Sequence, residues 1–167
     1  MTEQQVTRDD PVNFRKVTWD TFYAIAEDLK LKPEQEAYVS SNALSIGQAS
    51  FNPGAWYRAI YAGDVPIGFF MLFDPLRPGA RPRELIEPGD INLWRFMVDA
   101  RYQGMGFGTK ALDLIIAQIR EMPDRRRLTA SFLPGEHSPE VFYVNYGFRK
   151  TGRMRSKGRE VEIDIEL

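Results

Sequence analysis

The chain has 167 residues, 43% of them hydrophobic, and its 22 basic and 23 acidic side chains leave a formal net charge of −1. This length suits one domain spanning residues 1–167, and a charge near zero provides no overall field for binding nucleic acid. The lack of cysteine excludes disulfides, thiolate metal ligands and catalysis through an acyl-cysteine.

The N-terminus is polar and has none of the features of a secretory signal, which needs a basic start and an apolar run. No segment of the sequence reaches the roughly 18 apolar residues of a membrane-spanning helix. We therefore expect a soluble, cytoplasmic protein with no membrane, nucleic-acid or metal partner. Residues 1–14 are expected to be loosely ordered.

Two helices are expected in the first third of the chain. Residues 18–29 place Phe22, Ile25 and Leu29 on one face at helical spacing, and residues 33–49 show a similar apolar stripe. A hairpin is expected next, because two aromatic-rich runs, 56–62 and 65–73, flank the dipeptide Gly63-Asp64. Residues 74–90 hold four prolines and two glycines, which predicts a long exposed loop of the kind that often borders a site.

The centre of the chain predicts a strand over 91–98, a helix over 109–120 that Pro123 ends, and another strand over 128–132. Ser138 as N-cap and Pro139 as first helical residue then predict a short helix.

A final hairpin is expected between residues 148–155 and 160–167. The second of these runs alternates acidic and apolar side chains, the clearest period-two pattern in the sequence. The basic run over 149–159 resembles a nucleic-acid patch, but we expect it to pair with the acidic face of the last strand. Hairpins mixed with strand–helix units predict an α/β (α+β) fold with a mixed, mostly antiparallel sheet.

Gly104, Gly106 and Gly108 stand between the central strand and the helix that follows it. Glycines let several backbone N–H groups form one concave site, and the helix N-terminus adds a positive dipole end, so this loop predicts a phosphate or diphosphate site. The spacing fits neither the nucleotide P-loop nor the dinucleotide fingerprint. A tight strand-to-helix turn without a ligand is the alternative.

Arg101, Gly104 and Gly106 match the pattern Arg/Gln-x-x-Gly-x-Gly/Ala, and Tyr143 is followed by Tyr146-Gly147-Phe148. In these two motifs and their order the chain resembles the GNAT superfamily of N-acetyltransferases. The resemblance implies a twisted central sheet of about six or seven strands flanked by about four helices.

The resemblance also has a narrower form. The stretches SSNALSIGQA, LWRFMVDARYQGMGFG and SPEVFYVNYGFRKTG resemble the bacterial spermine/spermidine (diamine) acetyltransferase branch.

In GNAT enzymes the central strand pairs with the pantetheine arm of acetyl-CoA, and the glycine loop binds its diphosphate. Carried over, this implies the following acetyl-CoA-binding residues: Phe96, Met97, Val98, Arg101, Gln103, Gly104, Met105, Gly106, Phe107, Gly108, Thr109 and Lys110. Solvated surface charge is the alternative for Arg101 and Lys110. The same alternative is favoured for the basic run 124–127, which we considered for the nucleotide phosphate.

The resemblance makes Tyr143 the general acid, because a phenol with a pKa near 10 can give the departing thiolate its proton. A core aromatic is the alternative. The acceptor amine also needs a general base, and the candidates are Glu84, Glu87 and Asp90. Each of these carboxylates is alternatively a solvated charge. We also consider His137 for the same role, and a bystander surface residue is the alternative for it.

The expected function is an acetyl-CoA-dependent N-acetyltransferase that transfers acetyl directly to a primary amine of a small molecule. The narrower resemblance implies a polyamine such as spermidine or spermine. The alternatives are another amine (an amino acid, an aminoglycoside or a protein N-terminus) and a sensor that binds CoA or a nucleotide without turnover. The family is often dimeric, which makes a homodimer an expectation too.

Overall fold

The structure, a computed structural model, describes residues 5–84 and 86–167. Seven strands form one sheet in the order β1-β2-β3-β4-β5-β7-β6, and only β4 and β5 run parallel. The strands are β1 (Val12–Arg15), β2 (Ala55–Ala62), β3 (Val65–Phe73), β4 (Asp90–Val98), β5 (Arg127–Phe132), β6 (Arg149–Arg155) and β7 (Glu160–Glu166). The expected α/β fold with a mostly antiparallel sheet is confirmed.

The α-helices of the described residues are α1 (Asn42–Ala49), α2 (Phe107–Arg120) and α3 (Glu140–Tyr146). Short 3-10 turns lie at Trp19–Thr21, Pro33–Tyr38 and Ala100–Tyr102, and a π-helical turn lies at Ala24–Asp28.

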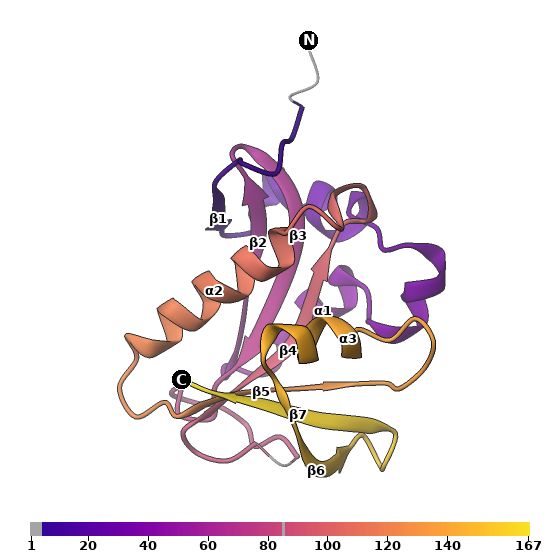
Figure 1. The fold of residues 1–167 in the computed structure, drawn as a ribbon. Coiled ribbons are helices and arrows are strands. Elements are labelled where there is room, and N and C mark those ends of the chain that lie inside the picture. Colours follow the sequence, from indigo (N-terminus) through magenta and orange to yellow (C-terminus); the bar gives the residue numbers. More distant parts are fainter. Residues whose placement is uncertain (1–4, 85) are drawn as a thin grey trace.

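The two faces of the sheet carry separate cores (Figure 1). Helix α2 covers one face, where its fully buried Leu112 and Ile119 pack with Ile60 and Ile91 of the sheet. The periodic apolar stripe of α2 explains this placement, because one face of the helix can leave water only against the sheet. On the other face the π-helical turn buries Ile25 in the second core.

Strands β4 and β5 separate part-way along their length (Figure 1). Their parallel pairing ends at Leu93 opposite Ala130, whereas β4 continues to Val98. A register shift opposite Met71 and Leu72 bulges β4 at the same point. A bulge bends and twists its strand, so the second half of β4 leaves β5 and presents a free edge. The candidate site described below lies at this opening.

The expected hairpin, β2 and β3, and the expected strands at 91–98 and 128–132 are confirmed. The expectation of loose order over residues 1–14 is wrong for the last part of this segment. Val12–Arg15 form β1, which pairs with β2, and Phe14 packs edge-on against Phe70 at 4.7 Å between ring centroids. Four residues are too few to show a period, so this strand depends on its partner. Residues 1–4 of the expectation lie outside the described part.

The first expected helix forms over residues 19–28 as a continuous run of 3-10, α-helical and π-helical turns, whereas the second does not form as one element. Residues 18–29 hold a 3-10 turn and a π-helical turn, which are enough to bury Ile25 while Trp19 stays exposed. Residues 33–49 divide at Ser41, because its Oγ accepts a hydrogen bond from Leu44 N–H (3.2 Å) and begins α1 there. A serine with this bond begins a helix and does not lie within one.

Helix α3 begins one residue later than expected. Pro139 is its N-cap, and Ser138 Oγ accepts a hydrogen bond from Glu140 N–H at 3.3 Å.

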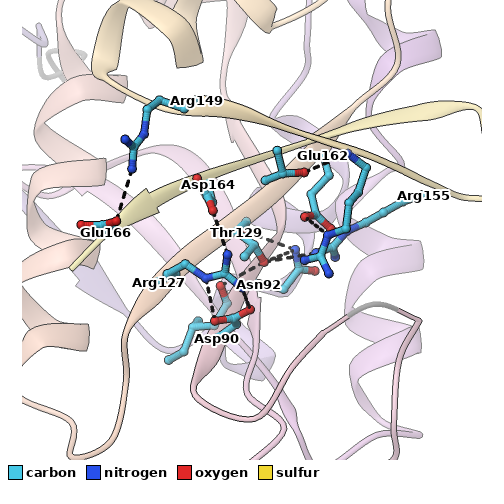
Figure 2. A network of polar contacts seen from close by, with 12 residues as sticks. Asp90, Asn92, Arg127, Thr129, Arg149, Arg155, Glu162, Asp164 and Glu166 are labelled. Atoms are coloured by element: carbon cyan, nitrogen blue, oxygen red, sulfur yellow. Dashed lines mark hydrogen bonds and ion pairs between the residues drawn. The ribbon is translucent and has the colours of Figure 1, made fainter.

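The final hairpin, β6 and β7, is confirmed, and so is the pairing of its basic and acidic faces. Arg149 pairs with Glu166 (3.4 Å), while Arg153 and Arg155 both pair with Glu162, at 2.8 and 2.6 Å (Figure 2). The Glu162 side chain is fully buried, because β5 and β6 flank β7 on both sides.

Candidate active site

Two cavities meet between the separated strands β4 and β5. The first, of about 450 Å³, lies between the second half of β4, the glycine loop and α3. The second, of about 380 Å³, lies over the first half of β4 and the ends of β5, β6 and β7. Both volumes are in the range of small-molecule sites. Five residues line both cavities: Tyr38, Val39, Phe96, Pro139 and Tyr143.

The glycine loop presents bare backbone to the first cavity. Gly104 and Gly106 have φ of 76° and 86°, the left-handed region that favours glycine. A Cβ built at either position would meet nothing within 4 Å, so the space above both is open. The first hydrogen bond into α2 runs from Lys110 N–H to the Gly106 carbonyl oxygen (3.2 Å), which leaves the earlier N–H groups of the helix unpaired within it. These donors and the helix dipole fit a diphosphate.

Gly108 serves a different purpose, which is close packing. A Cβ there would lie 3.1 Å from the Phe142 ring. Phe142 in turn stacks on Phe96 with 5.9 Å between ring centroids and 14° between planes. The small residue therefore lets α2 approach α3, and the stacked rings join α3 to β4.

Nine of the twelve residues expected to bind acetyl-CoA line the first cavity: Phe96, Met97, Val98, Gln103, Gly104, Gly106, Phe107, Gly108 and Thr109. The structure places Met105 and both cations outside this lining. The Arg101 guanidinium pairs with Asp99 (2.8 Å), and Lys110 Nζ donates to the Arg8 carbonyl oxygen (2.5 Å). The two cations thus bond to other parts of the chain and do not line the first cavity.

Tyr143 stands where the two cavities meet. Its ring packs against Phe142 and Phe148, with centroids 5.4 and 5.3 Å away, and its side chain is almost fully buried. Among the described residues the phenol has no hydrogen-bond partner. Burial raises the pKa of the Tyr143 phenol. A phenol with a raised pKa keeps its proton at neutral pH, as a general acid must.

The three carboxylates expected as general bases are not brought together. Glu84 lines the second cavity with Tyr143. Asp90 is fully buried in an ion pair with Arg127 (2.6 Å, Figure 2), and Glu87 lines a separate hollow with Arg125, Arg126 and Arg127. His137 lines the first cavity. Glu84 alone of the three carboxylates therefore shares a cavity with Tyr143.

The second cavity contains charged residues that the sequence analysis did not single out for the site. Glu160 is partly buried and accepts a hydrogen bond from Ser131 Oγ at 2.6 Å. Arg83 and Arg95 line the same cavity. Arg83 lies in the proline-rich loop expected to border a site, which was the available signal. Glu160 lies in a regular run of alternating acidic residues, which gave none.

Arg155 belongs to a buried polar network beneath this cavity (Figure 2). Its Nε donates to Glu162 (2.6 Å), and Asn92 Nδ2 donates to the Thr129 carbonyl oxygen (3.2 Å). Burial by itself would raise the pKa of Glu162, but hydrogen bonds and charge from Arg155 and Arg153 outweigh it and lower the pKa. The network is internally paired and gives the cavity a rigid polar floor.

A model of the Acetyltransferase (GNAT) family matches residues 14–148, which include the glycine loop and Tyr143. The chain belongs to the GNAT acetyltransferase family. It is 27% identical to a spermine/spermidine N(1)-acetyltransferase of Bacillus subtilis (strain 168) over 157 residues, which are 91% of this chain and 97% of the relative.

Solved structures share the fold of this GNAT chain. The aminoglycoside acetyltransferase AAC(6')-Ib in complex with ribostamycin and coenzyme A has a TM-score of 0.73 at 17% identity, with 94% of each chain covered. An acetyl transferase from Salmonella typhimurium that modifies the N-terminal serine of ribosomal protein L7/L12 has a TM-score of 0.70 at 14% identity, covering 97% and 98%.

Within residues 5–84 and 86–167, no three or more His, Asp or Glu side chains gather in a group that would hold a metal ion. In the same ranges no helix has the length and apolar character needed to cross a bilayer.

Proposed function

We propose that this GNAT protein is an N-acetyltransferase that moves the acetyl group of acetyl-CoA directly to a primary amine of a small molecule. The observation that carries the proposal is Tyr143, a protonated phenol at the junction of two cavities. One cavity has the open amides that a diphosphate needs. The other is polar and holds carboxylates suited to an amine.

In this proposal the N–H groups from Gln103 to Gly108 bind the diphosphate, and the free edge of β4 from Phe96 to Val98 aligns the pantetheine arm. Acetyl-CoA supplies the thioester. A backbone N–H of the same edge stabilises the negative charge that develops on the acyl oxygen.

The proton balance assigns a role to each cavity. The amine nitrogen forms a bond to the acyl carbon as the carbon–sulfur bond breaks, and Tyr143 Oη gives its proton to the departing sulfur. The proton that the nitrogen then loses on becoming an amide restores the phenol. The incoming ammonium must first lose a proton. Glu36, Glu84 and Glu160 are the candidates to accept it among the described residues, because all three line the cavity that Tyr143 shares.

The names of the Bacillus subtilis relatives make a polyamine the first acceptor to test. At 27% identity this choice is a proposal that rests on the relatives' names. The second cavity is lined by Glu36, Glu84 and Glu160 and also by Arg83, Arg95 and Arg155. The homodimer expected from the family also stays a prediction, which sedimentation measures.

The test is release of CoA thiol from acetyl-CoA in the presence of spermine, spermidine, diamines, amino acids and aminoglycosides. Turnover with at least one amine, at a rate that saturates with acetyl-CoA, is expected. Acetyl-CoA binding without thiol release against every amine would contradict the enzyme and favour the sensor.

A further inference from the structure

The second cavity contains two guanidinium groups that lack a carboxylate partner. Arg155 pairs with the buried Glu162 below the cavity (2.6 Å), whereas no ion pair joins Arg83 or Arg95 to a carboxylate among the described residues. Cationic side chains in the interior of a protein are ordinarily paired, because burying an unpaired charge is costly. These two arginines therefore need an explanation.

Arg83 is held in place by neutral groups. Its Nη1 donates to Asn92 Oδ1 (2.9 Å), and its guanidinium carbon lies 3.4 Å from the centre of the Trp94 ring. Asn92 is itself fixed by Thr129, within the network of Figure 2. The stacked, planar guanidinium is thus oriented before any ligand arrives, which lowers the entropic cost of binding.

Arg95 is also held in place by neutral groups. Its Nη1 donates to the Trp94 carbonyl oxygen (2.8 Å), and its Nη2 donates to Ser40 and Gln48 (3.1 and 3.2 Å). Its Nε is buried and has no hydrogen-bond partner among the described residues. A buried cationic N–H donor without an acceptor costs stability.

The charges of the cavity do not cancel around this pair. Burial, followed by repulsion from Arg95 and Arg155, lowers the pKa of Arg83 to about 9, and burial also lowers the pKa of Arg95. The negative charge of Glu160 acts to raise the pKa of both arginines. Glu36 and Glu84 are exposed, so Glu160 is the partly buried carboxylate that faces two guanidiniums. Among the partly buried groups, one carboxylate therefore stands against two guanidiniums, and water screens the charges of the exposed Glu36 and Glu84.

We propose that the amine accepted by this enzyme also carries a carboxylate, which Arg83 and Arg95 bind in the cavity shared with Tyr143. The inference rests on the proposed function and specifies its substrate class. A guanidinium matches a carboxylate with two parallel N–H donors, which favours this anion over a single-point contact. Glu160 then attracts the ammonium end of the same molecule.

The consequence for polyamines is direct. Spermidine brings only positive charge, so it would meet both arginines without neutralising either. An amine with a carboxylate brings one negative charge to the guanidiniums and one ammonium group toward Glu160 and Tyr143. The cavity therefore discriminates by charge pattern, in which repulsion counts as much as attraction.

The test compares amines that differ only in the carboxylate: lysine with cadaverine, ornithine with putrescine, and 4-aminobutyrate with propylamine. For the wild-type protein we expect kcat/KM to favour the carboxylated member of at least one pair by roughly 10-fold or more. Arg83→Gln should raise KM for that member and lower KM for the other, because it removes a guanidinium that binds the carboxylate and repels the purely cationic amine. Arg83→Lys should reverse part of both changes. Arg95→Gln should act in the same direction.

Arg81→Gln is the matched control, because Arg81 lies in the same loop, is exposed and does not line the cavity. It should leave both members of every pair unchanged. A wild-type protein that turns over spermidine and cadaverine better than any carboxylated amine would overturn the carboxylate proposal and leave the acetyltransferase standing. Equal effects of Arg83→Gln on both members would overturn it as well.

If no amine releases CoA thiol, the proposed function fails and the carboxylate is tested by binding alone. Calorimetric titration of each matched pair into the protein saturated with CoA then provides the readout. Heat from the carboxylated members that is lost in Arg83→Gln supports the arginine site. Equal heat from both members, or none from either, contradicts it.

Discussion

The Asp99 carboxylate accepts hydrogen bonds from Arg101 through both its backbone N–H (2.9 Å) and its guanidinium (2.8 Å). Its other oxygen accepts the backbone N–H of Lys30 (2.8 Å). The arginine of the glycine motif thus bonds within the chain, where it helps hold the end of β4 and the start of the glycine loop.

We predict that Asp99→Ala destabilises the protein by about 2–3 kcal/mol, because several buried N–H donors lose a charged acceptor. It should also weaken acetyl-CoA binding, since the loop loses its anchor. Arg101→Ala is the comparison variant, because 61% of that side chain is exposed. Urea unfolding and calorimetric titration with acetyl-CoA measure both effects. An equal loss of acetyl-CoA affinity in Arg101→Ala would mean that the guanidinium contacts the ligand directly.

Tyr143→Phe should lower kcat by roughly 10²-fold or more and leave the affinity for acetyl-CoA nearly unchanged. The variant removes the proton donor and keeps the ring that packs against Phe142 and Phe148. Steady-state thiol release and a binding titration separate the two quantities. Tyr146→Phe is the control, because its hydroxyl donates to Asp113 (2.7 Å) and does not line the cavities. Comparable turnover in both variants would remove Tyr143 from the mechanism.

The double variant Gly104→Ala/Gly106→Ala should reduce acetyl-CoA affinity by roughly 10-fold or more. An alanine in the left-handed region costs about 1–2 kcal/mol, so the loop would leave the conformation that gathers its N–H groups. Gly47→Ala is the control. It lies within α1, where a Cβ meets nothing within 4 Å, and there alanine should stabilise the helix slightly without changing affinity. Unchanged affinity in the double variant would sink the diphosphate site.

Stability should fall in acid in a defined window. Burial opposes ionisation of both Asp99 and Glu162. Hydrogen bonds from the Arg101 guanidinium and from backbone N–H groups nevertheless lower the pKa of Asp99, and contacts with Arg155 and Arg153 lower the pKa of Glu162. A lowered pKa in the folded state stabilises the protein at pH values above the unfolded pKa, which is about 4 for both groups. That stability is lost as pH falls from there through the folded values.

We therefore expect the urea midpoint to change little between about pH 7 and pH 5 and to decline below about pH 4. Glu162→Gln should lower the midpoint at neutral pH and make the acid decline shallower, because Arg153 and Arg155 lose their shared anion. An unaltered acid slope in Glu162→Gln would show that other carboxylates carry the dependence.

Much of this architecture follows from local pattern. The hairpin around Gly63-Asp64, helix α2 and the alternating last strand could be predicted because each is specified by a period or a turn within about a dozen residues. The glycine loop belongs with them, since glycine spacing before a helix is a local signal for open backbone.

Other features required partners far along the chain. Asp90 resembles a free carboxylate at the start of a strand until Arg127 of β5 pairs with it. Glu162 is one of several alternating acidic residues, and only its position between β5 and β6 buries it. The four-residue β1 exists because β2 offers it an edge.

The sequence by itself determined the class of fold, the glycine loop and the tyrosine of the family motif, because these depend on residue type and short spacing. Only the tertiary structure decided which charges meet in the second cavity. Arg83, Arg95 and Glu160 come from a loop and two strands, and electrostatic environment depends on distance in space, which spacing along the chain does not encode.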